Sequence, residues 1–222
     1  MKVAERIDTN LSKLLAIRNL TDSAYILRFE RNDMNFQAGQ YITVGHKDDV
    51  DVREYSIYST EQEPFLEVLI KEVEEGKLSK QLKNITVGEE LKVDGPFGFF
   101  TLSKSAVEHR KFLFVASGTG ISPFHSMIGS YPNLNYKLLH GVRFGNEAYE
   151  KVHYHNDKIT VCTSRDKNGD YHGRVTDYLK KHRVTADTHV YLCGNCNMIY
   201  DVYDILSEQD FPSDNIHAEV YF

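Results

Sequence analysis

The chain lacks any run of about 18 consecutive apolar residues, the length that a membrane-spanning helix requires. Its opening segment, MKVAERIDTNLSKLL, carries acidic residues where a secretory signal peptide needs an apolar block. We therefore expect no membrane insertion and a cytoplasmic location.

Cysteine and positive charge are also scarce. The three cysteines, Cys162, Cys193 and Cys196, are too few for a secreted disulfide framework or for the four thiolates of an iron–sulfur cluster. The formal net charge of −6 leaves no general basic field to attract nucleic acid. The 222 residues, 41% hydrophobic and 26% charged, fit one or two soluble domains with an ordinary core.

The first half of the chain consists of short segments in which apolar and polar residues alternate, separated by turn residues. This pattern predicts a small antiparallel barrel or sandwich, interrupted by one helix at residues 77–85. The expected strands cover residues 23–30, 40–46, 54–60, 65–73 and 89–95.

From residue 111 onward, continuous apolar runs alternate with helix-like segments. Such alternation is typical of a parallel sheet covered by helices on both faces. We therefore expect an all-β domain over residues 1–105 and an α/β domain of the nucleotide-binding type over residues 106–222. The expected strands of the second domain lie at residues 111–117, 136–143, 159–165, 189–195 and 216–222, with helices at 124–131, 175–181 and 198–209.

Ligands of open α/β sheets lie beyond the carboxyl ends of the strands, where loop amides face them. Gly118 and Gly120 would let the backbone approach a pyrophosphate, although a purely structural turn would also use glycine. Four strands are expected to end in such loops: GTG at 118–120, GVR at 141–143, TSR at 163–165 and CGN at 193–195.

Ser164, Arg165 and Arg174 offer a hydroxyl and two guanidinium groups near one of these strand ends. They can bind a ribose phosphate through charge-assisted hydrogen bonds, or the arginines can be solvated surface charges. In the first half, Arg53, Tyr55 and Ser56 combine a cation, a flat ring and a hydroxyl, with the first two on one face of a strand. A plain strand with an exposed arginine would look the same.

The sequence ends on HAEVYF, residues 217–222. An alternating segment of this kind is either an ordinary final strand or a strand whose two rings cover something flat. The GKLS segment at residues 76–79 is a second phosphate-sized feature, because Ser79 and the neighbouring amides open the expected helix.

These motifs resemble, in their order along the whole chain, those of the ferredoxin–NADP reductase family, and the resemblance is greatest to its compact bacterial members. The resemblance implies an FAD-dependent enzyme that transfers hydride between NADP(H) and flavin and single electrons to or from ferredoxin or flavodoxin. The motifs are RxYS at 53–56, GKLS at 76–79, GTGISP at 118–123, TSR at 163–165, CGN at 193–195 and AEVYF at 218–222.

The resemblance also implies residue roles on the flavin side. Arg53 would pair with the flavin diphosphate, Tyr55 would lie against one face of the isoalloxazine and Ser56 would sit near its N5. Tyr221 would cover the other face, and Phe222 would stack on the adenine. The implied FAD set comprises Arg53, Tyr55, Ser56, Ile70, Lys71, Gly76, Lys77, Leu78, Ser79, Tyr221 and Phe222.

On the nucleotide side, the resemblance places Cys193 beside the nicotinamide with Glu219 nearby, and makes these two and Ser56 the catalytic residues. Alternatively, Cys193 is a small core residue and Glu219 is an ordinary carboxylate at the edge of a strand. The implied NADP set comprises Gly118, Thr119, Gly120, Arg143, Ser164, Arg165, Arg174, Cys193 and Gly194.

Three alternatives stay open. The GPFG segment at residues 95–98 is more familiar from NADH-dependent flavin reductases and plant-type members, which suggests a reductase for an oxygenase or for free flavin. Cys193 and Cys196 form a C-x-x-C that resembles a thioredoxin-type dithiol. A non-catalytic flavin-binding sensor is the third.

Two weaker signals concern metals and partners. His153 and His155 form an H-x-H pair in a polar segment, which favours a solvated loop over a metal site. Lys77, Lys80 and Lys83 recur at helical spacing and either receive an acidic carrier protein or form a solvated face. We expect a monomer without a bound metal.

Overall fold

Strands β1 to β6 form an antiparallel six-stranded sheet in the order β4-β3-β6-β1-β2-β5, which curls into a barrel. The computed structural model describes residues 10–221, so Phe222 lies outside the described residues. The barrel elements are β1 (Leu11–Asn19), β2 (Ala24–Glu30), β3 (Tyr41–His46), β4 (Val52–Ser56), β5 (Phe65–Lys71), α1 (Lys77–Lys83) and β6 (Glu90–Phe97).

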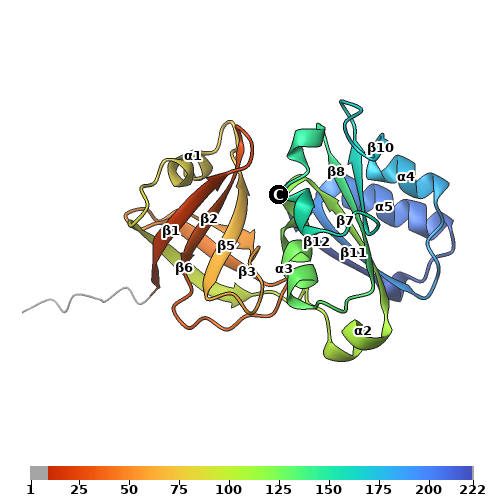
Figure 1. Ribbon diagram of the computed structural model, residues 1–222, viewed down its shortest axis with the longest axis horizontal. Coiled ribbons are helices and arrows are strands. Elements are labelled where there is room, and N and C mark those ends of the chain that lie inside the picture. The colour runs from red at the N-terminus through yellow and green to blue at the C-terminus, as the bar shows by residue number, and fades with distance from the viewer. Residues whose placement is uncertain (1–9, 222) are drawn as a thin grey trace, which may run out of the picture.

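After α2 (Lys104–His109), the chain forms a parallel six-stranded sheet in the order β10-β9-β8-β7-β11-β12 (Figure 1). Helices α4 and α5 lie on the side of this sheet away from the barrel, and α3 lies on the barrel side. The elements are β7 (Lys111–Ser117), η1 (Gly118–Ile121), α3 (Ser122–Ser130), β8 (Tyr136–Val142), η2 (Gly145–Glu147), η3 (Lys151–His153), β9 (Ile159–Thr163), β10 (Tyr171–His172), α4 (Val175–Lys181), β11 (Thr188–Asn195), α5 (Cys196–Glu208), η4 (Ser213–Asn215) and β12 (Ile216–Tyr221).

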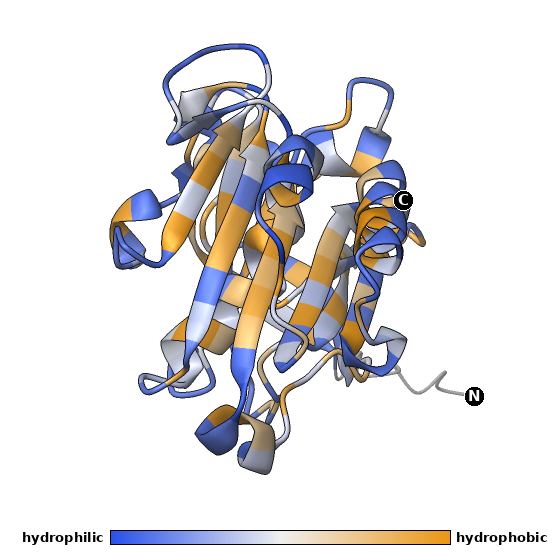
Figure 2. Ribbon diagram, turned by 90° about the vertical axis from the view of Figure 1, so that its right-hand side faces the viewer, coloured by the Kyte–Doolittle hydropathy of each residue, from blue (hydrophilic) through white to orange (hydrophobic). Residues whose placement is uncertain are grey.

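Alternation along the buried strands distributes side chains between separate cores. On β7, Phe112 and Phe114 point toward α3, whereas Leu113 and Val115 point toward α4 and α5. Both faces of this strand are covered, which is why its sequence is apolar without a break. Figure 2 shows the apolar colour running along the strands. The expected combination of an antiparallel barrel and a parallel α/β domain is confirmed.

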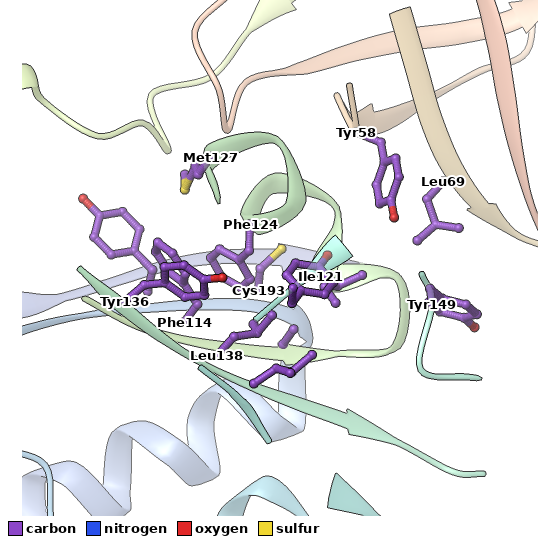
Figure 3. Packing of buried hydrophobic residues seen from close by; sticks show 14 of the residues in the cluster. Tyr58, Leu69, Phe114, Ile121, Phe124, Met127, Tyr136, Leu138, Tyr149 and Cys193 are labelled. Carbon is purple, nitrogen blue, oxygen red and sulfur yellow. The ribbon is translucent and has the colours of Figure 1, made fainter. Parts of the chain in front are cut away.

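Strand β2 forms the wall between the barrel and the second domain. Tyr25, Leu27 and Phe29 fill the barrel interior, while Ala24 and Ile26 face the other way, into a cluster shared with the parallel sheet. On the far side of that cluster lie Phe114, Phe124 and Cys193, and Figure 3 shows Tyr58 and Leu69 approaching them from the barrel. The two domains therefore share one apolar core.

Strand β1 was not predicted. Its pairing with β2 shifts register between Leu14 and Ala16, so the alternation that would reveal a strand is broken at its centre. Among the described residues, none of the helices has the length and apolar character needed to cross a membrane.

Candidate active site

Four side chains predicted to lie near the reacting atoms meet where the two domains touch. The Tyr221 hydroxyl donates a 2.6 Å hydrogen bond to Oγ of Ser56, and the Ser56 hydroxyl donates a 3.1 Å bond to Oε2 of Glu219. The Cys193 thiol adjoins the Tyr221 hydroxyl. Ser56 belongs to the barrel and the other three to the parallel sheet, so this cluster requires both domains.

Sheet register explains why the three residues of the second domain lie together. Residues opposite each other in a parallel pair share a face, as do residues two apart along one strand. Cys193 of β11 stands opposite Glu219 of β12, and Tyr221 follows two residues later. Strand β12 is the edge of its sheet, and its side chains Glu219 and Tyr221 reach Ser56 at the end of β4.

The cluster holds a carboxyl group with an unusual proton affinity. Burial raises the pKa of Glu219 to about 7, against the opposing effect of the bond from Ser56, and the nearby Glu54 raises it further. A carboxyl group with a pKa near neutrality can hold or release a proton at physiological pH. Gly98 of the GPFG segment borders it, because a Cβ at that position would lie 3.9 Å from Oε1 of Glu219.

Cys193 does not have the character of a thioredoxin-type nucleophile. Its side chain is fully buried, and burial raises the pKa of the thiol well above its usual value. Cys196 is the first residue of α5 and is only half-buried, and all three cysteines are free thiols. The dithiol alternative loses its main support, since an attacking cysteine needs a lowered pKa and access to solvent.

The barrel presents Tyr55 and Arg53 on strand β4. Tyr55 is half-buried against the barrel core, and burial raises the pKa of its phenol to about 12, so the ring stays neutral. Arg53 is exposed and donates a 2.7 Å hydrogen bond to the Val52 carbonyl. Among residues 10–221 its guanidinium forms no ion pair, which leaves it able to bind a phosphate.

Around α1, only part of the predicted flavin set faces outward. Ile70 and Leu78 are buried in the barrel core, so their side chains cannot face a ligand. Oγ of Ser79 accepts a 3.0 Å bond from the Val73 amide, and the Ser79 carbonyl accepts a bond from the buried Tyr25 hydroxyl. Gly76 precedes the helix as its N-cap residue, and Lys77 pairs with Asp49 at 2.8 Å.

A cavity of about 640 Å³ opens at the carboxyl ends of the parallel strands. Arg165 does not line it; that side chain is exposed, and its backbone amide donates a 2.8 Å bond to the Arg143 carbonyl. Gly120 and Cys193 are buried behind the lining. The predicted nucleotide residues that line the cavity are Gly118, Thr119, Arg143, Ser164, Arg174 and Gly194, together with Tyr221.

Glycine is required at positions 118 and 120 of this turn for two different structural reasons. A Cβ at Gly120 would lie 2.3 Å from the Cys193 carbonyl oxygen, so the turn packs directly on the neighbouring strand. Gly118 has φ of +54° and no atom within 4 Å of a Cβ built there, so its backbone faces open space. A half-buried backbone turn that lines the cavity beside a hydroxyl and two arginines fits a phosphate-bearing nucleotide.

Two residues of this region were missed by the sequence analysis. Glu147 accepts bonds from the guanidinium of Arg143 (2.9 Å) and the ammonium of Lys71 (3.1 Å), and these cations help hold its pKa at about 2 despite burial. Lys71, assigned to the flavin set, thus joins the barrel to the nucleotide cavity. His140 is buried and its Nε2 donates a 2.9 Å bond to the Gly118 carbonyl. No motif marked either residue, because the contact of Glu147 with Lys71 crosses the domains and that of His140 with Gly118 spans 22 residues.

Comparison with known proteins agrees with this two-part site. A family model described as an oxidoreductase FAD-binding domain matches residues 12–102, and one described as an oxidoreductase NAD-binding domain matches residues 114–204. The flavodoxin/ferredoxin–NADP reductase of Buchnera aphidicola subsp. Schizaphis graminum is 29% identical, over 94% of each chain. The toluate 1,2-dioxygenase electron transfer component of Pseudomonas putida is 25% identical over 92% of this chain and 65% of its own.

Solved structures show the same fold. A ferredoxin–NADP⁺ reductase from Neisseria gonorrhoeae, crystallised with FAD and NADP, superposes with a TM-score of 0.86 at 21% sequence identity. The match covers 96% of this chain and 98% of the other.

Proposed function

The chain belongs to the ferredoxin–NADP reductase family of flavoenzymes, and from that premise we propose that it transfers hydride between NADP(H) and FAD. We further propose that it passes single electrons to or from a small acidic carrier such as a ferredoxin or flavodoxin. The observation that carries the proposal is the contact of Ser56 with Tyr221 and Glu219, which joins the barrel to the open end of the parallel sheet.

The described residues fit both cofactors. The neutral ring of Tyr55 and the unpaired guanidinium of Arg53 suit a flat flavin and its diphosphate. The cavity holding Gly118, Ser164 and Arg174 suits the phosphates of NADP(H). When bound, these two cofactors supply the hydride donor and acceptor, so the protein needs to position them and control the surrounding charge.

The roles of the protein's own groups follow from their contacts. Tyr221 lines the nucleotide cavity and is held at the junction of the two domains by its bond to Ser56, so its ring would have to move for a nicotinamide to reach a flavin beside Ser56. Glu219 offers an exchangeable proton beside Ser56 because its pKa lies near 7. The Cys193 thiol is buried and neutral, and it borders the cluster without adding charge. These groups exclude water and orient the reactants, and none has to form a covalent bond.

The lysine stripe on α1 gives little support to carrier docking there. Lys77 pairs with Asp49, Lys83 pairs with Glu72, and Lys80 donates to the Glu74 carbonyl. All three amino groups are therefore already engaged by partners within the barrel domain. We propose a monomer as the working form, since both halves of the site come from one chain.

An anaerobic titration of the FAD-loaded protein with NADPH, and separately with NADH, tests the proposal. We expect the visible flavin bands to bleach rapidly with NADPH and slowly with NADH. Reduced enzyme should then reduce ferredoxin or flavodoxin faster than it reduces free flavin. A bound flavin that responds to neither nucleotide would favour the sensor alternative, and a protein that binds no FAD would overturn the proposal.

A second candidate is the reductase component of an oxygenase. The GPFG segment that borders Glu219 favours it, and the similarity to a toluate dioxygenase component agrees. Faster bleaching by NADH than by NADPH, with transfer to an oxygenase partner and none to flavodoxin, would select this candidate.

A further inference from the structure

A cluster of metal-binding side chains lies in the second domain, away from the candidate active site. His125 comes from α3, Glu150 is the N-cap residue of η3 and His153 is the last residue of η3. Nε2 of His125 lies 3.2 Å from Nδ1 of His153, and that Nδ1 lies 3.6 Å from Oε2 of Glu150. All three donor atoms lie within 4.8 Å of one another.

The two spacings that involve His153 are close to the edge length of a tetrahedral zinc site. Zinc binds imidazole nitrogen and carboxylate oxygen at about 2.0–2.2 Å, so two ligand atoms of one tetrahedron lie roughly 3.3 Å apart. Two histidines and one glutamate form a donor set known from open zinc sites, in which water takes the fourth position. The observed nitrogen–nitrogen and nitrogen–oxygen distances require only small movements to accept the ion.

The surroundings of His125 fix which of its nitrogens can bind a metal. Its Nδ1 lies 2.8 Å from the Tyr58 carbonyl oxygen, and its ring stacks on Tyr58 with centroids 3.7 Å apart. A carbonyl only accepts hydrogen bonds, so Nδ1 carries the proton and Nε2 presents its lone pair toward His153. Metal-bound histidines are oriented by such a bond to a backbone carbonyl.

Glu150 is held in the same way. Its Oε1 accepts a 3.0 Å bond from Arg18, and its Oε2 accepts a 2.9 Å bond from the Tyr58 hydroxyl. Each carboxylate oxygen has two lone pairs, so Oε2 keeps one for a metal while Tyr58 orients it. Arg18 and Tyr58 belong to the barrel, and thus both domains shape the cluster.

An ion can reach the cluster from solvent. A cavity of about 690 Å³ is lined by all three residues and also by His155. The side chain of His153 is 49% exposed, so one side of the cluster faces this cavity.

We propose that His125, Glu150 and His153 bind one Zn²⁺ ion, with a water molecule completing the site. The ion joins α3 to the η3 segment and reinforces the adjoining contact with Tyr58 of the barrel. Without metal, the same geometry is explained by a hydrogen bond from Nδ1 of His153 to Nε2 of His125. The proposal does not depend on the reductase activity.

The proposed site uses only one histidine of the H-x-H pair, because His155 is not a member of the cluster. The second histidine comes from 28 residues earlier, on a different element.

Equilibrium dialysis against Zn²⁺ with metal analysis tests the proposal on the full chain, loaded with FAD and free of any affinity tag. We expect one Zn²⁺ per chain, and we expect His153→Ala to weaken binding by about tenfold or more. His155→Ala is the matched control, because it removes an imidazole from the same cavity and should leave binding unchanged. Flavin content and melting temperature verify that each variant is folded, and Zn²⁺ should raise the melting temperature of all but His153→Ala.

His217→Ala serves as a second control. Nδ1 of His189 lies 3.5 Å from Nε2 of His217, so these residues offer another imidazole pair. Stoichiometric binding that survives His153→Ala, or that is lost equally in His155→Ala or His217→Ala, would overturn the assignment. Absence of zinc uptake by the wild-type protein at micromolar free metal would overturn it as well and leave the hydrogen bond between the two histidines.

Discussion

The hydroxyl of Tyr221 donates its hydrogen bond to Ser56, a residue 165 positions earlier in the chain and in the other domain. The donor stands on the edge strand of the parallel sheet and the acceptor at the end of a barrel strand. This bond can form only when the two domains are packed against each other as in this structure.

Tyr221→Phe removes the hydroxyl and keeps the ring, so it distinguishes the contributions of the two groups. Losing the bond to Ser56 should lower the free energy of unfolding by about 1 kcal/mol, while the retained ring should preserve the bound flavin. Tyr221→Ala removes both and should also reduce the flavin content or change nicotinamide affinity. Denaturant unfolding and the ratio of flavin to protein absorbance measure these effects. Equal flavin content and nucleotide affinity in all three proteins would show that the ring covers nothing.

Glu219→Gln should change how stability depends on pH. The folded pKa of about 7 lies above the ordinary 4.5, so the folded protein holds a proton that the unfolded chain releases. The stabilisation is complete below about pH 4.5 and is lost as pH rises through 7. Relative to the variant, the wild-type protein should therefore lose stability across this window, by less than about 3 kcal/mol. Thermal melts from pH 4.5 to 8 measure it, with the exposed Glu208→Gln as control. Parallel curves would mean that Glu219 has an ordinary pKa.

Arg174→Ala should weaken NADPH binding by about tenfold and NADH binding far less, because a charge-assisted phosphate contact is lost. Arg165→Ala should have a smaller effect, since its side chain lies outside the cavity lining. Arg183→Ala is the matched control, because that arginine bonds to the Gln209 carbonyl. Dissociation constants from flavin difference spectra decide the order. Equal losses for the two nucleotides in Arg174→Ala would remove the case for NADP preference.

Glu147→Gln should remove the part of the acid-induced loss of stability that comes from protonation of Glu147. The folded pKa of about 2 lies below the ordinary 4.5, so the stabilisation is present above pH 4.5 and is lost as pH falls toward 2. The wild-type advantage over the variant should reach at most about 3 kcal/mol at neutral pH. Asp187→Asn breaks an exposed pair with Lys111 and should cost little. A similar cost for both variants would refute a special role of Glu147.

Gly120→Ala and Gly118→Ala form a matched pair in one turn. At Gly120 the new methyl would collide with the backbone of β11, so both stability and nucleotide binding should fall sharply. At Gly118 the methyl meets open space, and only the left-handed backbone costs about 1–2 kcal/mol. Melting temperatures and NADPH affinity test the contrast, and a milder effect at Gly120 would contradict the packing described here.

The sequence predicted the fold class because buried strands differ visibly from alternating ones. The run at β7 is apolar on both faces, and the structure covers both faces with separate cores. Loops at strand ends were predictable for a similar reason, since parallel strands deliver their carboxyl ends to one edge. Gly118, Ser164 and Arg174 indeed share one cavity.

Pairings between distant residues could not be predicted in this way. The bond between Lys71 and Glu147 crosses the domain interface, and no periodicity relates the two positions. The contact of His125 with Tyr58 depends on how α3 packs against the barrel. The burial that raises the pKa of Glu219 likewise comes from tertiary packing, which a local pattern does not encode.

The apolar core shared by the two domains has a consequence for recombination. Ala24 and Ile26 of the barrel pack in the same cluster as Phe124 of the second domain, and the Phe100 ring lies 5.2 Å from that of Tyr191. In a chimera that takes its second domain from a relative, the apolar side chains of that domain would no longer fit those of the barrel in this shared cluster. An exchanged domain should function only when the cluster residues of the other domain are exchanged as well. The two domains are therefore expected to be inherited together.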